Sequence, residues 1–519
     1  MYYLDLDLVR CVSVGLSVVA LGCGTAAGLC GCHPYTCSDT VTCGTGKETE
    51  EPTCNADPAL DPAEDDCGVF ASESLGDDAN PGTRAQPVRT LTQAISLART
   101  GPLRVYACAE VFAEAVAVPS GLEVWGGLDC ANGWGYLGGD ARTVLAPASD
   151  LIPLQVEAAE LGGIATLADL RLEAADATLP GGSSIAMLVA PGAAVDLRRS
   201  ELLAGNGAKG APGARGGEDP AKAGTPGNGG AVACSAHSVQ GAPPVITVCG
   251  DATSVGGRGG DGNVTEGSDG NDGQPEPVPN PMGFGLGGSG ELSGLQCWSG
   301  LDGENGADGA HGEGAEGPGR ITVDGWIGRR GEDGDNGITA QGGGGGGGSR
   351  GGSLYCGLGP NLPSGGASGG SGGGGGCGGR GGKGGGYGGA SIGLVSFSGD
   401  VSLVATSIVT GNGGDGGAGG LAQLGGAPGA RGLGGSSVGG SNAGCDGGNG
   451  GRGGDGGYGG GGLGGPSIGI AHLTGQLPGG HGAAITTGMP GKGGPGGNQA
   501  VDDGAGEDGG RYDTLGFPQ

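Results

Sequence analysis

The chain has 519 residues, of which 139 are Gly and 30 are Pro. This proportion is far above that of ordinary globular proteins, so one conventional enzyme domain spread over the whole chain is excluded. Acidic residues outnumber basic ones by 54 to 24, and the net charge of −30 excludes electrostatic binding to nucleic acid or to anionic lipid surfaces. The 16 Cys residues indicate an oxidising compartment.

The N-terminus has the features of an export signal. Residues 11–21 are a mostly apolar stretch that is too short to span a bilayer as a helix but has the length of a signal-peptide core. The sequence Ala-Leu-Gly-Cys that ends at Cys23 resembles a bacterial lipobox, in which the Cys is lipidated and becomes the mature N-terminus. This resemblance implies a signal peptide over residues 1–22 and a lipid anchor on Cys23. A second candidate box ends at Cys32, and secretion after ordinary cleavage is the alternative.

Residues 23–66 are rich in Cys and in acidic residues and contain too few apolar side chains to build a core. We expect a tether that is ordered by disulfides. His33 and the Cys residues around it are also compatible with a zinc site. No second CxxC-type unit follows at a zinc-ligand spacing, however, and this favours disulfides.

Residues 67–99 combine a short strand, a polar turn and the start of a helix. Thr90 and Gln93 form a capping box, and the apolar residues that follow share one helical face. The segment, which contains GDDANPGT at 76–83, resembles the N-terminal module of bacterial right-handed parallel β-helix proteins of the pectin-lyase-like superfamily. That resemblance implies an all-β chain, a right-handed parallel β-helix whose open end is covered by an N-terminal capping helix.

Polar residues in this module also raise the question of a metal. Asp77, Asp78 and Asn80 are carboxylate and amide residues of the kind that hold Ca²⁺. Asx-rich turns of this type usually satisfy their own backbone instead, so we predict no metal site here.

Short stretches of alternating apolar and polar residues follow as far as residue 204. Leu170 and Leu172 point to one side and their neighbours to the other, which is the pattern of a half-buried strand. Residues 67–204 are therefore predicted to form the cap and the first coils. Cys108 and Cys130 bracket two such strands and are our candidate disulfide; a buried pair of free thiols is the alternative.

An internal repeat links distant parts of the chain. Similar apolar stretches begin at Ser184, Ser391 and Ser467, and the first two copies both continue to a Gly-Asn-Gly sequence. Equivalent coils would stack, because one coil alone buries too few apolar side chains to be stable. We therefore expect Ile185, Ile392 and Ile468 to lie in one column.

The same repeat predicts how residues 205–519 are organised. They would be coils interrupted by long Gly-rich loop insertions, which leave from one corner after Gly205 and after Gly411. Residues 245–248 and 320–327 are weaker candidates for further coils.

The Gly-rich tracts repeat Gly at every third position over several stretches, but they contain too little Pro for a collagen triple helix. Two interpretations remain. The tracts are either disordered loops or polyproline-II-like strands that pack side by side, similar to the GGxGGxGG regions of PE-PGRS proteins. We expect a mixture, with loops most exposed to proteases in 257–320 and 342–385.

No arrangement of residues predicts catalytic, cofactor-binding or metal-binding groups. Two function classes are carried forward. The first is a non-enzymatic, lipid-anchored or secreted structural or adhesion protein that presents acidic Gly-rich loops on the bacterial cell envelope, at the outer membrane surface or outside the cell. The second is a protein of the pectin-lyase-like superfamily that binds or degrades polysaccharide. The partners expected are cell-surface polysaccharide or matrix components, with the membrane reached only through the lipid.

Overall fold

The computed structural model describes residue 54 and residues 57–159, 162–250, 252–293, 295–357, 364–475, 483–498 and 504–518. All of these belong to one unit, Cys54–Gln519. The predicted signal peptide, Cys23, Cys32, His33 and most of the predicted tether lie outside the described residues.

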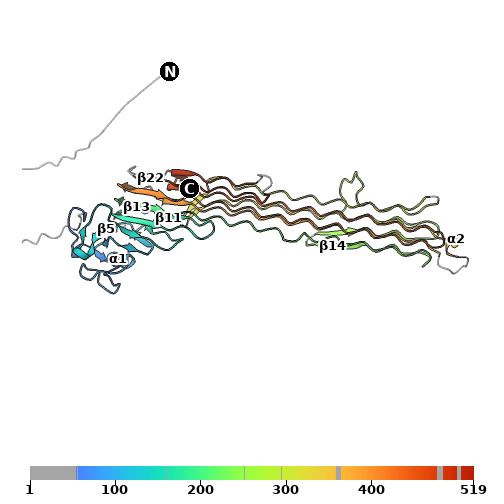
Figure 1. The fold of residues 1–519 in the computed structure, drawn as a ribbon, viewed down its shortest axis with the longest axis horizontal. Coiled ribbons are helices and arrows are strands. Elements are labelled where there is room, and N and C mark those ends of the chain that lie inside the picture. The colour runs from blue at the N-terminus through green and yellow to red at the C-terminus, as the bar shows by residue number, and fades with distance from the viewer. Residues whose placement is uncertain are drawn as a thin grey trace, which may run out of the picture. The chain divides into compact units, whose positions relative to one another are not determined.

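Most of the regular structure is β-strand, arranged in three parallel sheets (Figure 1). The first sheet contains β1 (Val69–Ala71), β2 (Arg104–Cys108), β5 (Glu123–Asp129), β9 (Ala165–Ala168), β12 (Val195–Arg198) and β19 (Val401–Val404), and β6 (Gly135–Tyr136) pairs antiparallel with β5. The second contains β3 (Val111–Phe112), β7 (Thr143–Leu145), β10 (Leu170–Ala174), β13 (Glu201–Ala204), β20 (Ser407–Thr410) and β22 (Ala484–Thr486). The third contains β4 (Val116–Pro119), β8 (Leu154–Glu157), β11 (Ser184–Val189), β18 (Ser391–Ser396), β21 (Ser467–Leu473) and β23 (Arg511–Phe517).

The chain visits the three sheets in turn, so that each circuit adds one strand to each sheet from β2 to β13. Apolar side chains of all three sheets form one core between them. In the third sheet, for example, Leu154 pairs with Met187, Met187 with Leu394 and Leu394 with Ile470. Stacking the same apolar position from strand to strand is what allows short strands to share a continuous core.

Helix α1 (Leu91–Ala98) packs against one end of this core through Leu91, Ala94, Ile95 and Ala98. Its N-terminus is capped in the way the sequence predicts, because Thr90 Oγ1 accepts a hydrogen bond from the backbone N–H of Gln93 at 3.1 Å. The carboxylate of Glu114 accepts two more, from the N–H groups of Leu91 and Thr92. Two short 3₁₀ helices, η1 (Asp65–Cys67) and η2 (Cys130–Asn132), complete this region.

The columns expected from the internal repeat are confirmed. Ile185 pairs with Ile392, and Ile392 pairs with Ile468, across three neighbouring strands. In the first sheet Val195 pairs with Val401 and Leu197 with Leu403. Strands separated by long Gly-rich tracts therefore belong to the same stack.

The weaker candidate coils are wrong. Residues 245–248 lie in an antiparallel hairpin of β14 (Val245–Cys249) and β15 (Ala252–Gly256), and residues 320–327 form a second hairpin of β16 (Arg320–Thr322) and β17 (Gly325–Ile327). Neither hairpin joins the three parallel sheets. Alternating apolar residues are the same in a hairpin and in a coil, so this pattern alone does not distinguish them.

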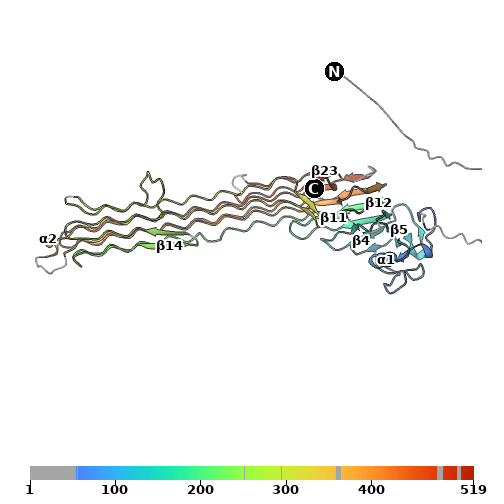
Figure 2. The same ribbon diagram turned by 180° about the vertical axis from the view of Figure 1, so that it is seen from behind.

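The Gly-rich tracts leave and rejoin the sheets at one corner. Each tract follows a strand of the second sheet (β13, β20 or β22) and returns into a strand of the third sheet (β18, β21 or β23). Between these points the segments run side by side away from the sheets (Figures 1 and 2). The prediction that the insertions share one corner, after Gly205 and after Gly411, is therefore confirmed. We call the described parts of 205–390, 411–466 and 487–510 the Gly-rich bundle.

Hydrogen bonds in the Gly-rich bundle repeat every three residues. The N–H groups of Gly207, Gly210 and Gly213 donate to the carbonyls of Asn412, Asp415 and Ala418 at 2.8 Å each. The pairing continues to Ala233 and Ser436, with a step of three residues throughout the second segment and in the first except between Gly216 and Ala221. A repeat of three is that of a polyproline-II helix, which has three residues per turn and no hydrogen bonds of its own.

The run Gly342–Gly348 lies in the middle of the bundle. Its N–H groups donate in turn to three segments, 268–274, 298–301 and 370–373, at N···O distances of 2.8–3.1 Å. Its carbonyls accept from three others, 257–260, 288–291 and 445–448, at 2.8–3.0 Å. A Cβ atom added at any position from Gly342 to Gly348 would come closer than 3.0 Å to neighbouring backbone. Seven consecutive glycines are therefore required by packing on every side.

This arrangement corrects the expected long Gly-rich loop insertions, including the protease-sensitive loops expected in 342–385, for the described residues 342–349 and 364–385. Residues 340–349 are buried or nearly so, and their backbone is hydrogen-bonded. Gly removes side chains from the contact surface, so backbones approach closely enough to bond to one another. The loss of chain entropy that favours loops is offset by these bonds.

Candidate functional site

Five disulfides join Cys residues of the described unit: Cys54–Cys67, Cys108–Cys130, Cys234–Cys356, Cys249–Cys377 and Cys297–Cys445. The second is the pair singled out from the sequence. The last three fix segments of the Gly-rich bundle to one another across 122, 128 and 148 residues. Disulfides of this number indicate an oxidising environment, outside the cell or in its envelope.

Acidic and amide side chains along the Gly-rich bundle are engaged with the backbone. Asp302, Asn305 and Asp308 accept hydrogen bonds from the N–H groups of Asn449, Arg452 and Asp455 at 2.6–2.7 Å. His311 Nδ1 continues the row by accepting from Tyr458 N–H at 3.0 Å. The backbone N–H groups just before and just after each of these donors bond to carbonyls of other segments. Among the described residues the N–H between them has no such carbonyl partner, so a side chain supplies the acceptor.

A similar row closes the corner where the tracts leave the sheets. Asp176 accepts from the N–H of Asn206, the Asn206 amide oxygen accepts from Asn412 N–H, and the Asn412 amide oxygen accepts from Met489 N–H, at 2.6, 2.8 and 2.8 Å. This is the role of the Asn in the repeated Gly-Asn-Gly sequence. The repeat is visible in the sequence. The hydrogen-bond partner of each Asn is not, because it depends on which tracts lie next to one another in the fold.

The backbone donors affect the carboxylates as well. The N–H of Gly384 and the ammonium of Lys383, which lies 2.9 Å from the carboxylate, lower the pKa of Asp333. Burial alone would raise the pKa of Asp455, but hydrogen bonds from the N–H of Gly425 and from Arg452 outweigh it and lower that pKa. These carboxylates are ionised at neutral pH and are part of the packing.

Charged residues on the three sheets pair with close neighbours. Arg198 contacts Asp196 on its own strand, and Arg171 lies 3.5 Å from Glu201 on the next strand. Asp169 sits at a corner and contacts Arg199 at 2.7 Å, which also contacts Asp57 at 2.9 Å. These hydrogen bonds raise the pKa of the Arg199 guanidinium. Asp57 belongs to the end of the predicted tether, so this end is fixed to the sheets.

The polar turn of the N-terminal module satisfies its own backbone. Asp78 Oδ1 accepts hydrogen bonds from the N–H groups of Arg89 and Thr90, and Asp77 Oδ1 accepts from Ala79 N–H. The Asn80 amide donates to Pro87 O at 2.8 Å. Across the described ranges no three or more His, Cys, Asp or Glu residues are placed to share a metal ion. In the same part of the chain no helix is long and apolar enough to cross a membrane.

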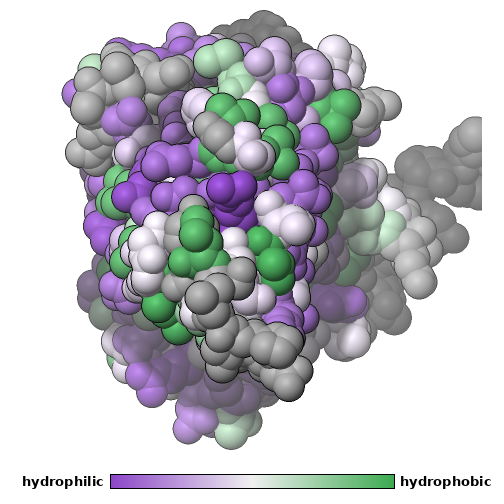
Figure 3. Space-filling view, turned by 90° about the vertical axis from the view of Figure 1, so that its right-hand side faces the viewer, coloured by the Kyte–Doolittle hydropathy of each residue, from purple (hydrophilic) through white to green (hydrophobic). Residues whose placement is uncertain are grey.

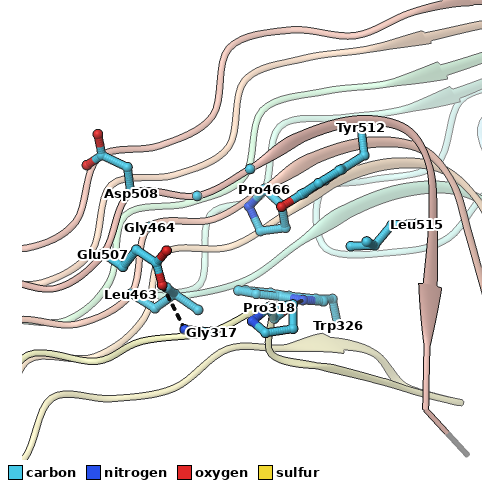
Figure 4. A pocket seen from close by; sticks show the side chains of 12 residues that line it. Gly317, Pro318, Trp326, Leu463, Gly464, Pro466, Glu507, Asp508, Tyr512 and Leu515 are labelled. Carbon is cyan, nitrogen blue, oxygen red and sulfur yellow. Dashed lines mark hydrogen bonds between the residues drawn. The ribbon is translucent and has the colours of Figure 1, made fainter.

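A cavity of about 430 Å³ lies where the Gly-rich bundle meets the third sheet. Its walls include Trp326 of the second hairpin and Tyr512 of β23, and Glu507 lies to one side of both aromatic side chains, beside Gly317 (Figure 4). The rest of the lining is Gly317, Pro318, Leu463, Gly464, Pro466, Asp508, Gly509, Gly510 and Leu515. We call this hollow the Trp326 cavity. Its volume is that of a small-ligand site.

Local contacts fix the walls of the Trp326 cavity. The Trp326 indole N–H donates to Pro318 O at 3.0 Å, and the ring packs edge-on against Tyr387 at 5.7 Å between centroids. Glu507 Oε2 accepts from Gly317 N–H at 2.9 Å. The ring of Tyr512 packs over Gly510, where a Cβ would overlap it. Trp326 is only 4% exposed, whereas Tyr512 is 37% exposed, so Tyr512 is the more accessible aromatic wall.

No family model, curated protein or solved structure matches this chain. The resemblances to pectin-lyase-like β-helix proteins and to PE-PGRS proteins therefore stay predictions from the residues.

The Trp326 cavity was not predicted from the sequence, because its walls come from segments almost 200 residues apart and carry no shared motif. The only signal was the isolated aromatic residue in each segment.

Proposed function

We propose that the protein is a non-catalytic structural or adhesion protein of the bacterial cell surface, anchored through a lipid on Cys23 or secreted. In this proposal the three sheets are a right-handed parallel β-helix of the pectin-lyase-like type. The Gly-rich bundle is a stiff extension of it. The observation that carries the proposal is the bonding of Gly342–Gly348 to six neighbouring segments, because a segment held on all sides cannot move as a loop.

The hydrogen bonds of the acidic residues support a structural role for the protein. Asp302, Asp308, Asp333 and Asp455 all accept backbone hydrogen bonds, so their first role is to hold segments together. The remaining negative charge keeps copies of the chain apart and soluble outside the cell. The proposed partners are cell-surface polysaccharide or matrix components, and not nucleic acid.

The end of the bundle that carries α2 (Ser353–Cys356) supports a contact role. Figure 3 shows this end, where hydrophobic residues are exposed among hydrophilic ones. Leu354 is 82% exposed and Leu295 is 64% exposed. Exposed apolar side chains at the end of a stiff support are typical of surfaces that bind other molecules.

The adhesion role is tested by displaying the full chain on a bacterial host and measuring attachment to other cells and to coated surfaces. The variant Leu295→Ser/Leu354→Ser is compared with Leu60→Ser/Leu75→Ser, which changes two equally exposed leucines near β1. We expect the first pair to reduce attachment several-fold and the second to leave it unchanged. Equal attachment of all three proteins, or of cells without the chain, contradicts an adhesive end.

The alternative proposal is a polysaccharide-binding or polysaccharide-degrading protein. The aromatic walls of the Trp326 cavity favour it, because aromatic faces often carry sugar rings. Incubating the purified chain with pectin and other acidic polysaccharides separates the two proposals. Release of reducing ends or of unsaturated products would establish the enzyme and overturn the non-catalytic role.

A further inference from the structure

The Trp326 cavity has the composition of a site for a cation. It contains two carboxylates, Glu507 and Asp508, and two aromatic rings, and none of its lining residues is basic. The remaining side chains are Pro and Leu, which offer an apolar wall to a hydrocarbon arm. A second carboxylate and an aromatic face disfavour an anion at the same place.

Glu507 has capacity for a ligand. Its Oε2 atom accepts from Gly317 N–H, which fixes the carboxylate at the cavity wall (Figure 4). Its Oε1 atom has no partner within the described residues. Asp508 differs, because its Oδ1 atom is engaged by the N–H of Gly493 at 2.7 Å. Glu507 is therefore the carboxylate placed to receive a charge-assisted hydrogen bond.

The nearest basic residue in sequence turns away from the cavity. Arg511 precedes Tyr512 in β23, and successive side chains of a strand point to opposite faces. The Arg511 guanidinium donates to Thr487 Oγ1 at 2.7 Å, just after β22 in the second sheet. With a net charge of −30 on the chain, the field around the cavity also favours cations.

We propose that the Trp326 cavity binds an organic cation: a guanidinium or alkylammonium group on a short aliphatic arm. The charged group lies against Glu507 Oε1 and the face of Tyr512, and the arm lies against Pro318, Pro466 and Leu515. Cation–aromatic and charge-assisted contacts act together in this arrangement. The inference does not depend on the adhesion role, since a structural protein and an enzyme are equally able to hold such a group.

The test is calorimetric titration of the purified chain with N-acetyl-arginine amide, and with N-acetyl-citrulline amide as its neutral counterpart of nearly the same shape. We expect the arginine compound to bind at least about tenfold more tightly, a difference of about 1.4 kcal/mol. Added NaCl should weaken its binding, because a partly exposed charge pair is screened. Tetramethylammonium and an arginine-containing peptide then show whether a free cation or a protein side chain is the better ligand.

Two variants locate the site. Glu507→Gln keeps an acceptor for Gly317 N–H but removes the charge, and it should weaken binding of the arginine compound about tenfold. Glu313→Gln removes the same charge from an exposed position outside the cavity and should leave binding unchanged. Equal binding of the arginine and citrulline compounds, no binding of either, or equal effects of the two variants would overturn the proposal.

Discussion

Ser391 Oγ donates a hydrogen bond to the carbonyl of Gly205 at 2.7 Å, although 186 residues separate them. Gly205 begins the first Gly-rich tract, and Ser391 is the first residue of the strand to which that tract returns. Ser467 repeats the contact with Gly411 O at 2.9 Å for the second tract. The serines that mark the repeat in the sequence therefore close each tract at its base.

This contact predicts a cost for Ser391→Ala. The side chain is fully buried, so the variant leaves the Gly205 carbonyl without that donor and should lower the free energy of unfolding by about 1–2 kcal/mol. Denaturant titration monitored by circular dichroism measures the change. Ser299→Ala, at an exposed position in the bundle, is the matched control and should have no measurable effect.

A single methyl group in the centre of the bundle should be destabilising. In Gly345→Ala the new Cβ would overlap the carbonyl of Arg258, and we expect a loss of about 3 kcal/mol or a local opening of the bundle. Gly135→Ala places the same methyl group in open space and serves as the control. Thermal unfolding of the two variants should differ clearly. If both unfold like the unaltered chain, the close backbone contacts do not exist.

The disulfides of the bundle should be worth more than local bridges. Cys297→Ser/Cys445→Ser removes a link across 148 residues, and we expect a loss of about 2–4 kcal/mol together with faster cleavage by proteases. Cys54→Ser/Cys67→Ser removes a link across 13 residues and should cost less. The comparison is made by thermal unfolding and by limited proteolysis without reductant. A larger effect from the shorter bridge would count against the bundle.

Acid should destabilise the bundle. The pKa values of Asp333 and Asp455 are lowered in the folded chain, so their contribution to stability is present above about pH 4 and is lost as the pH falls through the folded pKa values. The melting temperature should fall as the pH is lowered below about 4. Asp333→Asn/Asp455→Asn keeps one oxygen at each position to accept from the backbone N–H of Gly384 or Gly425 but removes the titration. Its melting temperature should depend less on pH in this range.

The sequence predicted the stacked strands because their apolar residues repeat with identical spacing, as at Ile185 and Ile392. The cap at Thr90 was equally visible, because its hydrogen bond is local. The bundle was only half anticipated. A glycine every third residue is compatible with both a loop and a packed segment. Which of the two forms depends on neighbours distant in sequence, such as Asn271 and Gly288, which bond to Gly345.

The roles of the acidic residues could not be predicted from the sequence, for the same reason. Asp308 bonds to the N–H of Asp455, 147 residues away, and nothing in either segment marks the partner. Read alone, such residues look like an exposed acidic surface. Their positions between glycines are explained only when both segments are seen together.

The central claim is that the Gly-rich segments form a hydrogen-bonded bundle, and amide hydrogen exchange tests it most directly. The native full chain is exchanged at neutral pH, and mass spectrometry compares peptides covering residues 342–349 with peptides covering β2. We predict protection of 342–349 within about tenfold of that of β2, because every N–H from Gly342 to Ser349 donates to another segment. Exchange of 342–349 at the rate of an unstructured peptide would contradict the bundle and restore the loop interpretation.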